Sequence, residues 1–193
     1  MRFSLAALVF MASPIALGAQ QPVSNPITAA MKQRTITFQQ RLTQAFDSIP
    51  ERIFGYKPTP AQQTIGYIAQ HLADDNYFYC NQFGAMKGTR AAEDTTTPDT
   101  VKAKWPKAKL IAQMQTSFKF CEDAFAQLDD AKLADQITQT LGNGQTRTVT
   151  RVGPVMGHII DMTDHYSQLA NYMRLNNILP PTALPRPRPP GGD

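Results

Sequence analysis

The sequence predicts an all-α protein built as a four-helix bundle. Four segments of about 20 residues each carry apolar side chains at every third or fourth position, so each is expected to form a helix with one apolar stripe. Polar segments that contain proline or glycine separate them. Four such helices bury their stripes most economically against one another. The 193 residues suffice for one domain of this kind and are too few for two ordinary ones.

Proline marks the limits of the first two predicted helices. The first runs from Pro26 to Ser48 and stops at Ile49-Pro50. The second opens at Thr59-Pro60, because threonine can cap a helix and proline suits the first helical position, and it ends near Phe83-Gly84. A polar loop over residues 87–105 follows, and its length leaves room for a crossover rather than a simple hairpin.

A short β-hairpin is predicted between the last two helices. The third helix runs from Pro106 to Leu128, and the fourth runs from Val152 to Asn176. Between them, alternating apolar and polar residues flank the glycine-rich turn Leu141-Gly142-Asn143-Gly144. Asn177 suits a left-handed C-cap after the last helix. Residues 180–193 hold six prolines and two glycines, which predicts a disordered or polyproline-like tail.

Residues 1–19 have the features of a secretory signal peptide. Arg2 supplies a positive start, an apolar stretch follows, Pro14 interrupts it, and small residues precede a cleavage point after Ala19. The alternative is an uncleaved membrane anchor, but about fifteen apolar residues fall short of the roughly 20 that a spanning helix needs. We therefore expect an exported protein, periplasmic or secreted, without stable membrane insertion after leader removal. Its bundle would occupy residues 25–179.

The two cysteines, Cys80 and Cys121, gain meaning from this expected export. Paired cysteines in an oxidising compartment usually form disulfides. Such a bond would close a loop of about 40 residues and stabilise the fold by roughly 3–4 kcal/mol in the chain-entropy model. The alternative is two buried free thiols.

The charge distribution argues against a nucleic-acid partner. Part of the net charge of +4 comes from Arg2, Arg186 and Arg188 at the chain ends. A nucleic-acid-binding protein concentrates basic charge on one folded face. The four lysines at positions 102, 104, 107 and 109 could form a phosphate-binding patch or simply the solvated face of a helix. We expect no nucleic-acid binding.

Histidine and aspartate spacing on two helices suggests a metal site. Asp161 and His165 lie four residues apart, hence on one helix face, and His158 lies a further turn back along that side. His71, on the core side of the second helix, could supply a third ligand from a facing helix. Two histidines and one carboxylate would leave coordination positions open, as in catalytic metal sites. The alternative is that these histidines are hydrogen-bonded core residues.

Two further aspartates lie beside these candidate ligands. Asp75 follows His71 by four residues, and Asp164 directly precedes His165. Either could orient a ligand through a hydrogen bond, or remain a solvated carboxylate.

Two stretches resemble motifs of the DinB-like superfamily. Thr64 to Tyr77, which reads TIGYIAQHLADDNY, is similar to the family's second-helix motif. Gly157 to Pro181, with Asp164-His165-Tyr166 and Tyr172-Met173-Arg174-Leu175, is similar to its last-helix motif. The resemblance covers roughly residues 25–181 and is strongest to exported members that carry a leader and two cysteines.

The resemblance implies a bundle of up-down-down-up topology that holds a divalent metal, most often zinc or nickel. The family's ligands are one histidine on the second helix and two histidines four residues apart on the last. By position these are His71, Asp161 and His165, with Asp161 in place of the usual middle histidine. The aspartate could ligate through oxygen, or it could mark weaker binding, a different metal or a lost site. His158 is the fallback ligand.

Some members of this family are metal-dependent thiol transferases or thiol-dependent isomerases. For this chain we expect an exported hydrolase or transferase that acts on a small-molecule substrate, with a divalent metal that activates water or another nucleophile. The alternative is a metal-free or non-catalytic helical bundle that serves as a binding module. Relatives are often dimers, so the resemblance makes a homodimer a candidate assembly.

Overall fold

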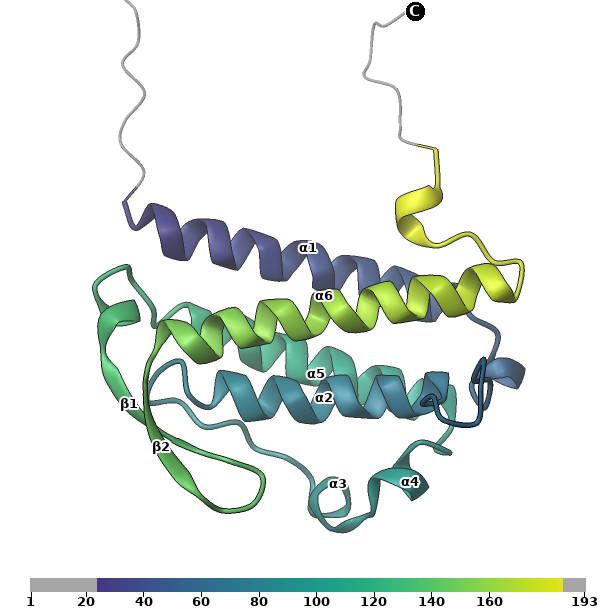
Figure 1. Cartoon of the computed structure of the whole chain (residues 1–193), viewed down its shortest axis with the longest axis horizontal. Helices are drawn as coiled ribbons and strands as arrows, with labels where there is room; N and C mark the ends of the chain where they lie inside the picture. The colour runs from purple at the N-terminus through teal and green to yellow at the C-terminus, as the bar shows by residue number, and fades with distance from the viewer. Residues whose placement is uncertain (1–23, 186–193) are drawn as a thin grey trace, which may run out of the picture.

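The computed structural model describes residues 24–185, so the predicted leader and the final residues of the predicted tail, 186–193, lie outside the described residues. Within that range the chain forms a four-helix bundle with a two-stranded antiparallel hairpin at one end, which confirms the predicted fold class (Figure 1). The bundle helices are α1 (Pro26–Ser48), α2 (Ile65–Cys80), α5 (Lys107–Phe125) and α6 (Val152–Leu175). The remaining elements are α3 (Ala92–Thr96), α4 (Asp99–Lys102), β1 (Gln136–Thr140) and β2 (Thr146–Thr150), with 3-10 turns at Glu51–Ile53, Lys132–Ala134 and Pro181–Ala183.

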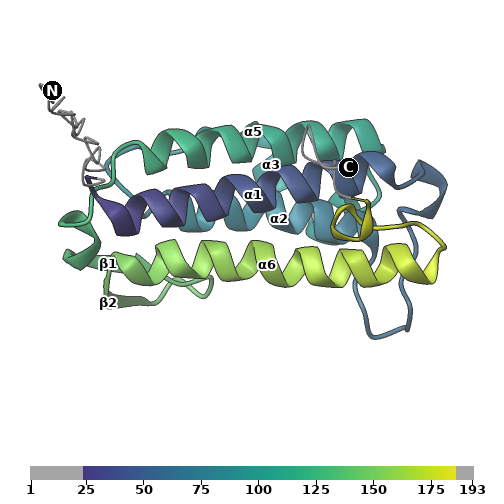
Figure 2. The ribbon, with the colours of Figure 1, turned by 90° about the horizontal axis from the view of Figure 1, so that it is seen from above.

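The helices have the up-down-down-up topology that the family resemblance implies. α1 and α6 run in one direction, and α2 and α5 run in the other (Figure 1). Seen from above in Figure 2, α1 lies between α5 and α6, with α2 behind it. Because α2 and α5 are parallel, the chain between them must return along the bundle. Residues 81–106 make this crossover and carry α3 and α4.

The ends of α1 and α6 lie where the sequence predicts them. Pro26 occupies the first turn of α1, and the chain leaves the helix at Ile49. The carboxylate of Asp130, beyond α5, accepts hydrogen bonds from the amides of Ile27 and Thr28 at 3.1 and 2.8 Å and so caps α1. Asn177, with φ of 59°, adopts the left-handed conformation after α6.

The predicted start of α2 at Thr59-Pro60 is wrong. Residues 59–62 form a separate turn, and the helix begins at Ile65, where the side chain of Thr64 accepts a hydrogen bond from the Tyr67 amide at 3.1 Å. The preceding loop satisfies the free amides of the first helical turn, because the Gly66 amide donates to the Phe54 carbonyl at 2.8 Å. Capping residues alone could not distinguish a helix start at Thr59 from one at Ile65, because the hydrogen bond between Gly66 and Phe54 depends on the folded loop.

Ionic contacts hold the crossover against α2. Asp74 on α2 accepts from the guanidinium of Arg90 and, at 2.5 Å, from the ammonium of Lys102. Lys102 is only 3% exposed and also pairs with Asp99 at 3.0 Å. A methyl group at Gly66 would lie 2.2 Å from the Ala103 carbonyl oxygen, so glycine permits this close approach.

Three of the four lysines between residues 102 and 109 make contacts within the protein and so do not form a shared phosphate-binding patch with Lys104. Lys102 is buried in its ion pairs. The ammonium of Lys107 donates to backbone carbonyls at the end of α1, and that of Lys109 pairs with Glu93 at 2.7 Å. Each of these three charges is therefore used in holding neighbouring segments together.

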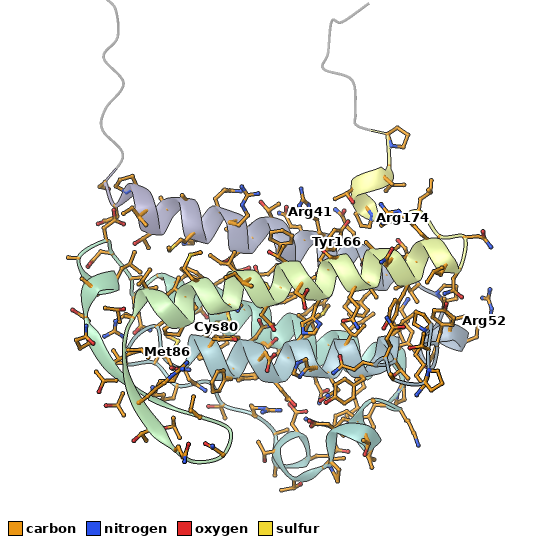
Figure 3. All side chains as sticks on the ribbon, in the orientation of Figure 1. Arg41, Arg52, Cys80, Met86, Tyr166 and Arg174 are labelled. Atoms are coloured by element: carbon orange, nitrogen blue, oxygen red, sulfur yellow. A yellow bond between two sulfur atoms is a disulfide. The ribbon has the colours of Figure 1, made fainter. Side chains whose placement is uncertain are left out.

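The hairpin forms around the predicted turn, and a 3-10 turn lies among the first residues of the predicted tail. Strands β1 and β2 pair with Gln136 opposite Thr150, and Gly144 takes φ of 78° in the turn. In the tail, Pro181–Ala183 form a 3-10 turn because the Tyr166 hydroxyl bonds Thr182 at its side chain and its amide, at 3.0 and 3.1 Å. Figure 3 labels Tyr166 on α6.

Among the described helices, none combines the length and apolarity needed to cross a membrane.

The core has two parts. The larger one fills the middle of the bundle and the end remote from the hairpin, with Leu42, Phe46, Leu72, Met114 and Leu169 each inaccessible to solvent. The smaller one lies toward the hairpin and contains Cys80, Phe83, Cys121, Phe125 and Val155 among its members. Cys80 is labelled at that end of the bundle in Figure 3.

A disulfide joins the two cysteines in the smaller core. Cys80, the last residue of α2, is bonded to Cys121 on α5, with a Cα–Cα distance of 5.3 Å. The buried Asn76 amide donates to the Ser117 hydroxyl at 2.8 Å one turn earlier along the same two helices. The parallel pair α2–α5 is thus fixed by one covalent bond and one buried hydrogen bond.

His158 lies in this smaller core. Its side chain is fully buried, and its ring contacts Phe83 at a centroid distance of 5.7 Å. Nδ1 lies 4.0 Å from the sulfur of Cys80. Burial lowers the pKa of His158 to about 4, so the imidazole is neutral in the folded protein at pH 7.

Replacing both Cys80 and Cys121 by alanine is expected to lower the free energy of unfolding by about 4 kcal/mol, since the loop of 41 residues is then open in the unfolded chain. Urea denaturation of the two proteins measures the difference. Alkylation before reduction should label neither cysteine of the wild type. Two labelled cysteines in the folded protein would contradict the disulfide.

His158→Leu should make stability less sensitive to acid. The unfolded imidazole binds a proton near pH 6.5, whereas the folded one resists until about pH 4, so this group's contribution is complete above pH 6.5 and is lost as the pH falls toward 4. That loss amounts to roughly 3 kcal/mol. Urea midpoints of both proteins between pH 7.5 and 4.5 test this. A difference between them that does not change with pH would contradict it.

Candidate metal centre

Two histidines and two aspartates meet where α2 and α6 pack side by side. His71 and Asp75 lie one turn apart on α2, and Asp161 and His165 lie one turn apart on α6. The two helices run in opposite directions (Figure 1), and the order of the residue types is reversed between them. Histidine therefore faces histidine and aspartate faces aspartate. One ligand atom from each of the four lies within 4.8 Å of the others.

The geometry of the cluster is that of a partly open site. His71 Nε2 lies 3.1 Å from a carboxylate oxygen of Asp75, and His165 Nε2 lies 3.5 Å from one of Asp161. The two imidazole rings meet edge to face at a centroid distance of 5.0 Å. The α2 side chains are 30% and 23% exposed and the α6 side chains 15% and 10% exposed, so solvent reaches the cluster chiefly on its α2 side.

The carboxylates are poorly compensated. Burial, the charge of Asp161 and a hydrogen bond to Asp161 together raise the pKa of Asp75 to about 7. The second oxygen of Asp161 is buried and has no hydrogen-bond partner within residues 24–185. In that part of the chain, the salt-bridge partners of these two aspartates are the two histidines. A cation at the cluster would relieve this repulsion.

The histidines respond to the same surroundings in opposite ways. Burial and the neighbouring charge of His165 lower the pKa of His71. Burial also opposes protonation of His165, but the hydrogen bond and the negative charge of Asp161 outweigh it and raise the pKa of His165. Each imidazole thus places a ring nitrogen close to the carboxylate oxygen of an aspartate on its own helix. An ion bound in the cluster would contact one nitrogen and one oxygen from each helix.

Gln168 orients His165. Its side-chain amide donates to the Tyr172 hydroxyl at 3.0 Å, which directs its carbonyl oxygen to His165 Nδ1 at 3.3 Å. That oxygen can only accept a hydrogen bond, so Nδ1 carries the hydrogen in neutral His165 and the lone pair of Nε2 faces the cluster. Metal-binding histidines are held in this way by a hydrogen bond on the other ring nitrogen.

The other residues that the sequence suggested as ligands or orienting groups take different positions in the structure. The structure includes Asp75 in the cluster, although the sequence predicts only an orienting role for it. Asp164 is exposed on α6 and has no place in the cluster. His158, the fallback ligand, lies beside the disulfide and contributes nothing to this cluster. The i, i+4 pair on α2 was the signal that could have identified Asp75.

A cavity of about 710 Å³ lies next to the cluster, at the start of α2. Phe54, Tyr67 and Trp105 supply aromatic surface to it, Lys57 and Lys104 supply positive charge, and Glu51 supplies one negative charge. Tyr67 connects the two features, because it lines the cavity and its ring lies 5.8 Å from that of His71. Sequence reasoning missed this cavity, since its walls come from three separate segments.

Solved structures share this fold at low sequence identity. A DinB-like protein from Bacillus cereus is 14% identical, with a TM-score of 0.62 over 79% of this chain and 95% of that one. YfiT from Bacillus subtilis, described as a probable metal-dependent hydrolase with an unusual four-helix bundle topology, is 12% identical, with a TM-score of 0.58 over 83% and 93%.

A mycothiol-dependent maleylpyruvate isomerase is also similar. It is 13% identical, with a TM-score of 0.57 over 74% of this chain, and the match spans only 60% of the isomerase. Identities this low establish the fold alone. No curated protein sequence matches this chain at a significant level.

A sequence-family match defines the relationship. The DinB superfamily model matches residues 34–158, which include His71 and Asp75 and end just before Asp161 and His165. The match covers well over half of the chain. Together with the up-down-down-up bundle, it shows that this chain belongs to the DinB superfamily.

Proposed function

We propose that the protein is a divalent-metal-dependent enzyme, a hydrolase or transferase that acts on a small molecule. Its metal ligands are His71, Asp161 and His165, joined by Asp75, and zinc or nickel is the expected ion. The observation that carries the proposal is the clustering of four ligand atoms within 4.8 Å of one another. They lie in the α2–α6 seam, the contact between these two helices at His71, Asp75, Asp161 and His165, where no lysine or arginine of the described chain pairs with either carboxylate.

The donor set fits a catalytic ion better than a structural one. Structural zinc sites are closed by four ligands and are usually rich in cysteine, whereas catalytic sites combine histidine with carboxylate and remain open to substrate. The seam supplies two imidazoles and two carboxylates, and it is partly exposed. Three of these groups can bind one ion and leave a coordination position open.

The ion would supply a Lewis acid that lowers the pKa of a bound nucleophile. The chain itself supplies orientation and proton handling. Gln168 keeps the lone pair of His165 directed into the seam. Asp75 is the carboxylate on the more exposed α2 side, so where the ion takes three ligands its free carboxylate stands beside the nucleophile and accepts its proton.

The cavity at Tyr67 provides the space for a substrate. Its aromatic walls suit a partly apolar molecule, and Lys57 and Lys104 suit a negatively charged group on that molecule. Because Tyr67 separates the cavity from His71, a substrate held there would extend past its ring to the metal cluster. Among proteins that share the fold, YfiT is described as a probable metal-dependent hydrolase and another protein is a mycothiol-dependent isomerase, so the proposal includes both hydrolysis and transfer.

Substitution of Asp161 or Asp164 tests the ligand assignment with a matched pair. Both are aspartates on α6, but only Asp161 lies in the cluster. Elemental analysis of the untagged protein should find about one divalent ion per chain in the wild type and in Asp164→Ala. Asp161→Ala should lower the affinity at least tenfold, and His71→Ala and His165→Ala should abolish stoichiometric binding while retaining the helical circular dichroism spectrum.

The same proteins separate the enzyme from a metal-free module. A metal that binds only the folded state raises the melting temperature, so a chelator should lower it in the wild type and not in His165→Ala. Equal metal content in Asp161→Ala and Asp164→Ala would refute the ligand assignment. A wild type that takes up neither zinc nor nickel would leave a helical binding module as the function.

We also infer export, which rests on the leader sequence at residues 1–19. Expression of the full chain in a Gram-negative host should give a periplasmic protein that begins at Gln20, as measured by intact mass. Ala19→Arg should retain the leader, because cleavage requires a small residue at that position. A cytoplasmic wild type with an intact leader would contradict export.

A further inference from the structure

A second group of metal-binding side chains lies at the hairpin end of the bundle. Cys80, Cys121 and His158 come from α2, α5 and α6 respectively, and each is inaccessible to solvent. Their sulfur and nitrogen atoms all lie within 4.8 Å of one another. The group shares no residue with the seam that contains His71 and His165.

We propose that reduction of the Cys80–Cys121 disulfide turns this group into a buried site for a thiophilic divalent ion such as Zn²⁺. Both thiolates and the imidazole of His158 are the ligands. The disulfide therefore alternates with a metal ion as the link between α2 and α5. The proposal is independent of the function assigned to the seam.

His158 is available for this role. Its Nδ1 lies 4.0 Å from the sulfur of Cys80, and its Nε2 has no hydrogen-bond partner within residues 24–185. Phe83, Phe125 and Tyr79 surround the ring, at centroid distances of 5.7, 6.3 and 6.4 Å. A fully buried ring nitrogen without a hydrogen-bond partner is unusual, because an unsatisfied polar group costs free energy inside a protein.

Charge balance favours a divalent ion over a monovalent one. Two thiolates and a neutral imidazole carry a charge of −2, which a divalent ion neutralises completely. A monovalent ion would leave one net negative charge in an apolar core, and such a charge is costly. Sulfur and imidazole ligands select zinc-type ions over magnesium and calcium, which prefer oxygen.

The chemistry is a two-electron reduction followed by proton release. A dithiol reductant attacks the disulfide, transfers two electrons and two protons to Cys80 and Cys121, and leaves as its own cyclic disulfide. Each sulfur is then free to turn about its Cα–Cβ bond. Binding of the divalent ion displaces the two thiol protons. The helices remain joined, because the ion bonds to both sulfurs.

Cobalt(II) gives a direct test, because thiolate ligands produce an intense charge-transfer absorption in the near ultraviolet that histidine and carboxylate ligands do not. The full mature chain is reduced with a phosphine in mild denaturant, returned to native buffer without oxygen, and titrated with Co²⁺. Reduced wild type should develop the thiolate band and saturate at about one thiolate-bound cobalt per chain. The oxidised protein should show no such band.

Substitutions distinguish this site from the seam. His158→Ala should weaken the cobalt–thiolate interaction at least tenfold, and the paired change Cys80→Ser with Cys121→Ser should remove the band. His71→Ala, a matched histidine substitution in the seam, should leave the band unchanged. No band in the reduced wild type, or an equal affinity in His158→Ala, would overturn the proposal.

Loss of the disulfide could by itself unfold the chain, and circular dichroism identifies that case. If the reduced protein is unfolded without metal, Zn²⁺ should restore its helical spectrum, and the His158→Ala protein should need at least tenfold more zinc. A reduced wild type that stays unfolded with Zn²⁺ would also overturn the proposal.

Discussion

Repulsion between two carboxylates in the α2–α6 seam is the constraint around which the packing of these two helices is organised. Asp75 and Asp161 face each other across antiparallel helices, and the pKa of Asp75 is raised to about 7 because burial and its neighbour both oppose its charge. A bundle without function would place apolar residues there, since buried like charges cost free energy. A folded chain that keeps both carboxylates at this contact needs a proton or a cation between them.

The neighbouring residue on α2 shows that positive side chains were within reach. Asp74 precedes Asp75 by one residue and accepts from both Arg90 and Lys102 of the crossover. Consecutive helical residues point about 100° apart, so the two carboxylates serve different surfaces. One aspartate is neutralised by the protein itself and fixes the crossover. The other is left for the seam, where its salt-bridge partner is His71.

The spacing of apolar residues predicted the helices well, because that spacing depends only on which face of a segment is buried. The limits of α1 from Pro26 to Ser48 agree with the sequence, since proline chemistry marks both ends. The predicted start of α2 was wrong because the hydrogen bond from the Gly66 amide to the Phe54 carbonyl, between residues 12 apart in sequence, fixes where the helix begins. The order of residues along a helix also cannot show which turn faces the neighbouring helix.

The candidate site shows the same division between local and tertiary information. Spacing correctly placed Asp161 and His165 on one face, and it also placed His158 on that side. Seven residues span about 10 Å along a helix, too far for His158 and His165 to share one ion. The i, i+4 spacing puts Asp75 on the helix face of His71, but the antiparallel pairing of α2 with α6 is what brings it opposite Asp161, and no local pattern contains that pairing.

The crossover has a kinetic consequence. An up-and-down bundle can assemble from helical hairpins, in which each helix packs on the next one along the chain. Here α2 must pack in parallel on α5, across the intervening residues 81–106, and α6 must return to α1 and α2. Contacts between residues distant in sequence slow folding, because the chain loses loop entropy before those contacts form. This protein should therefore fold more slowly than an up-and-down bundle of equal length.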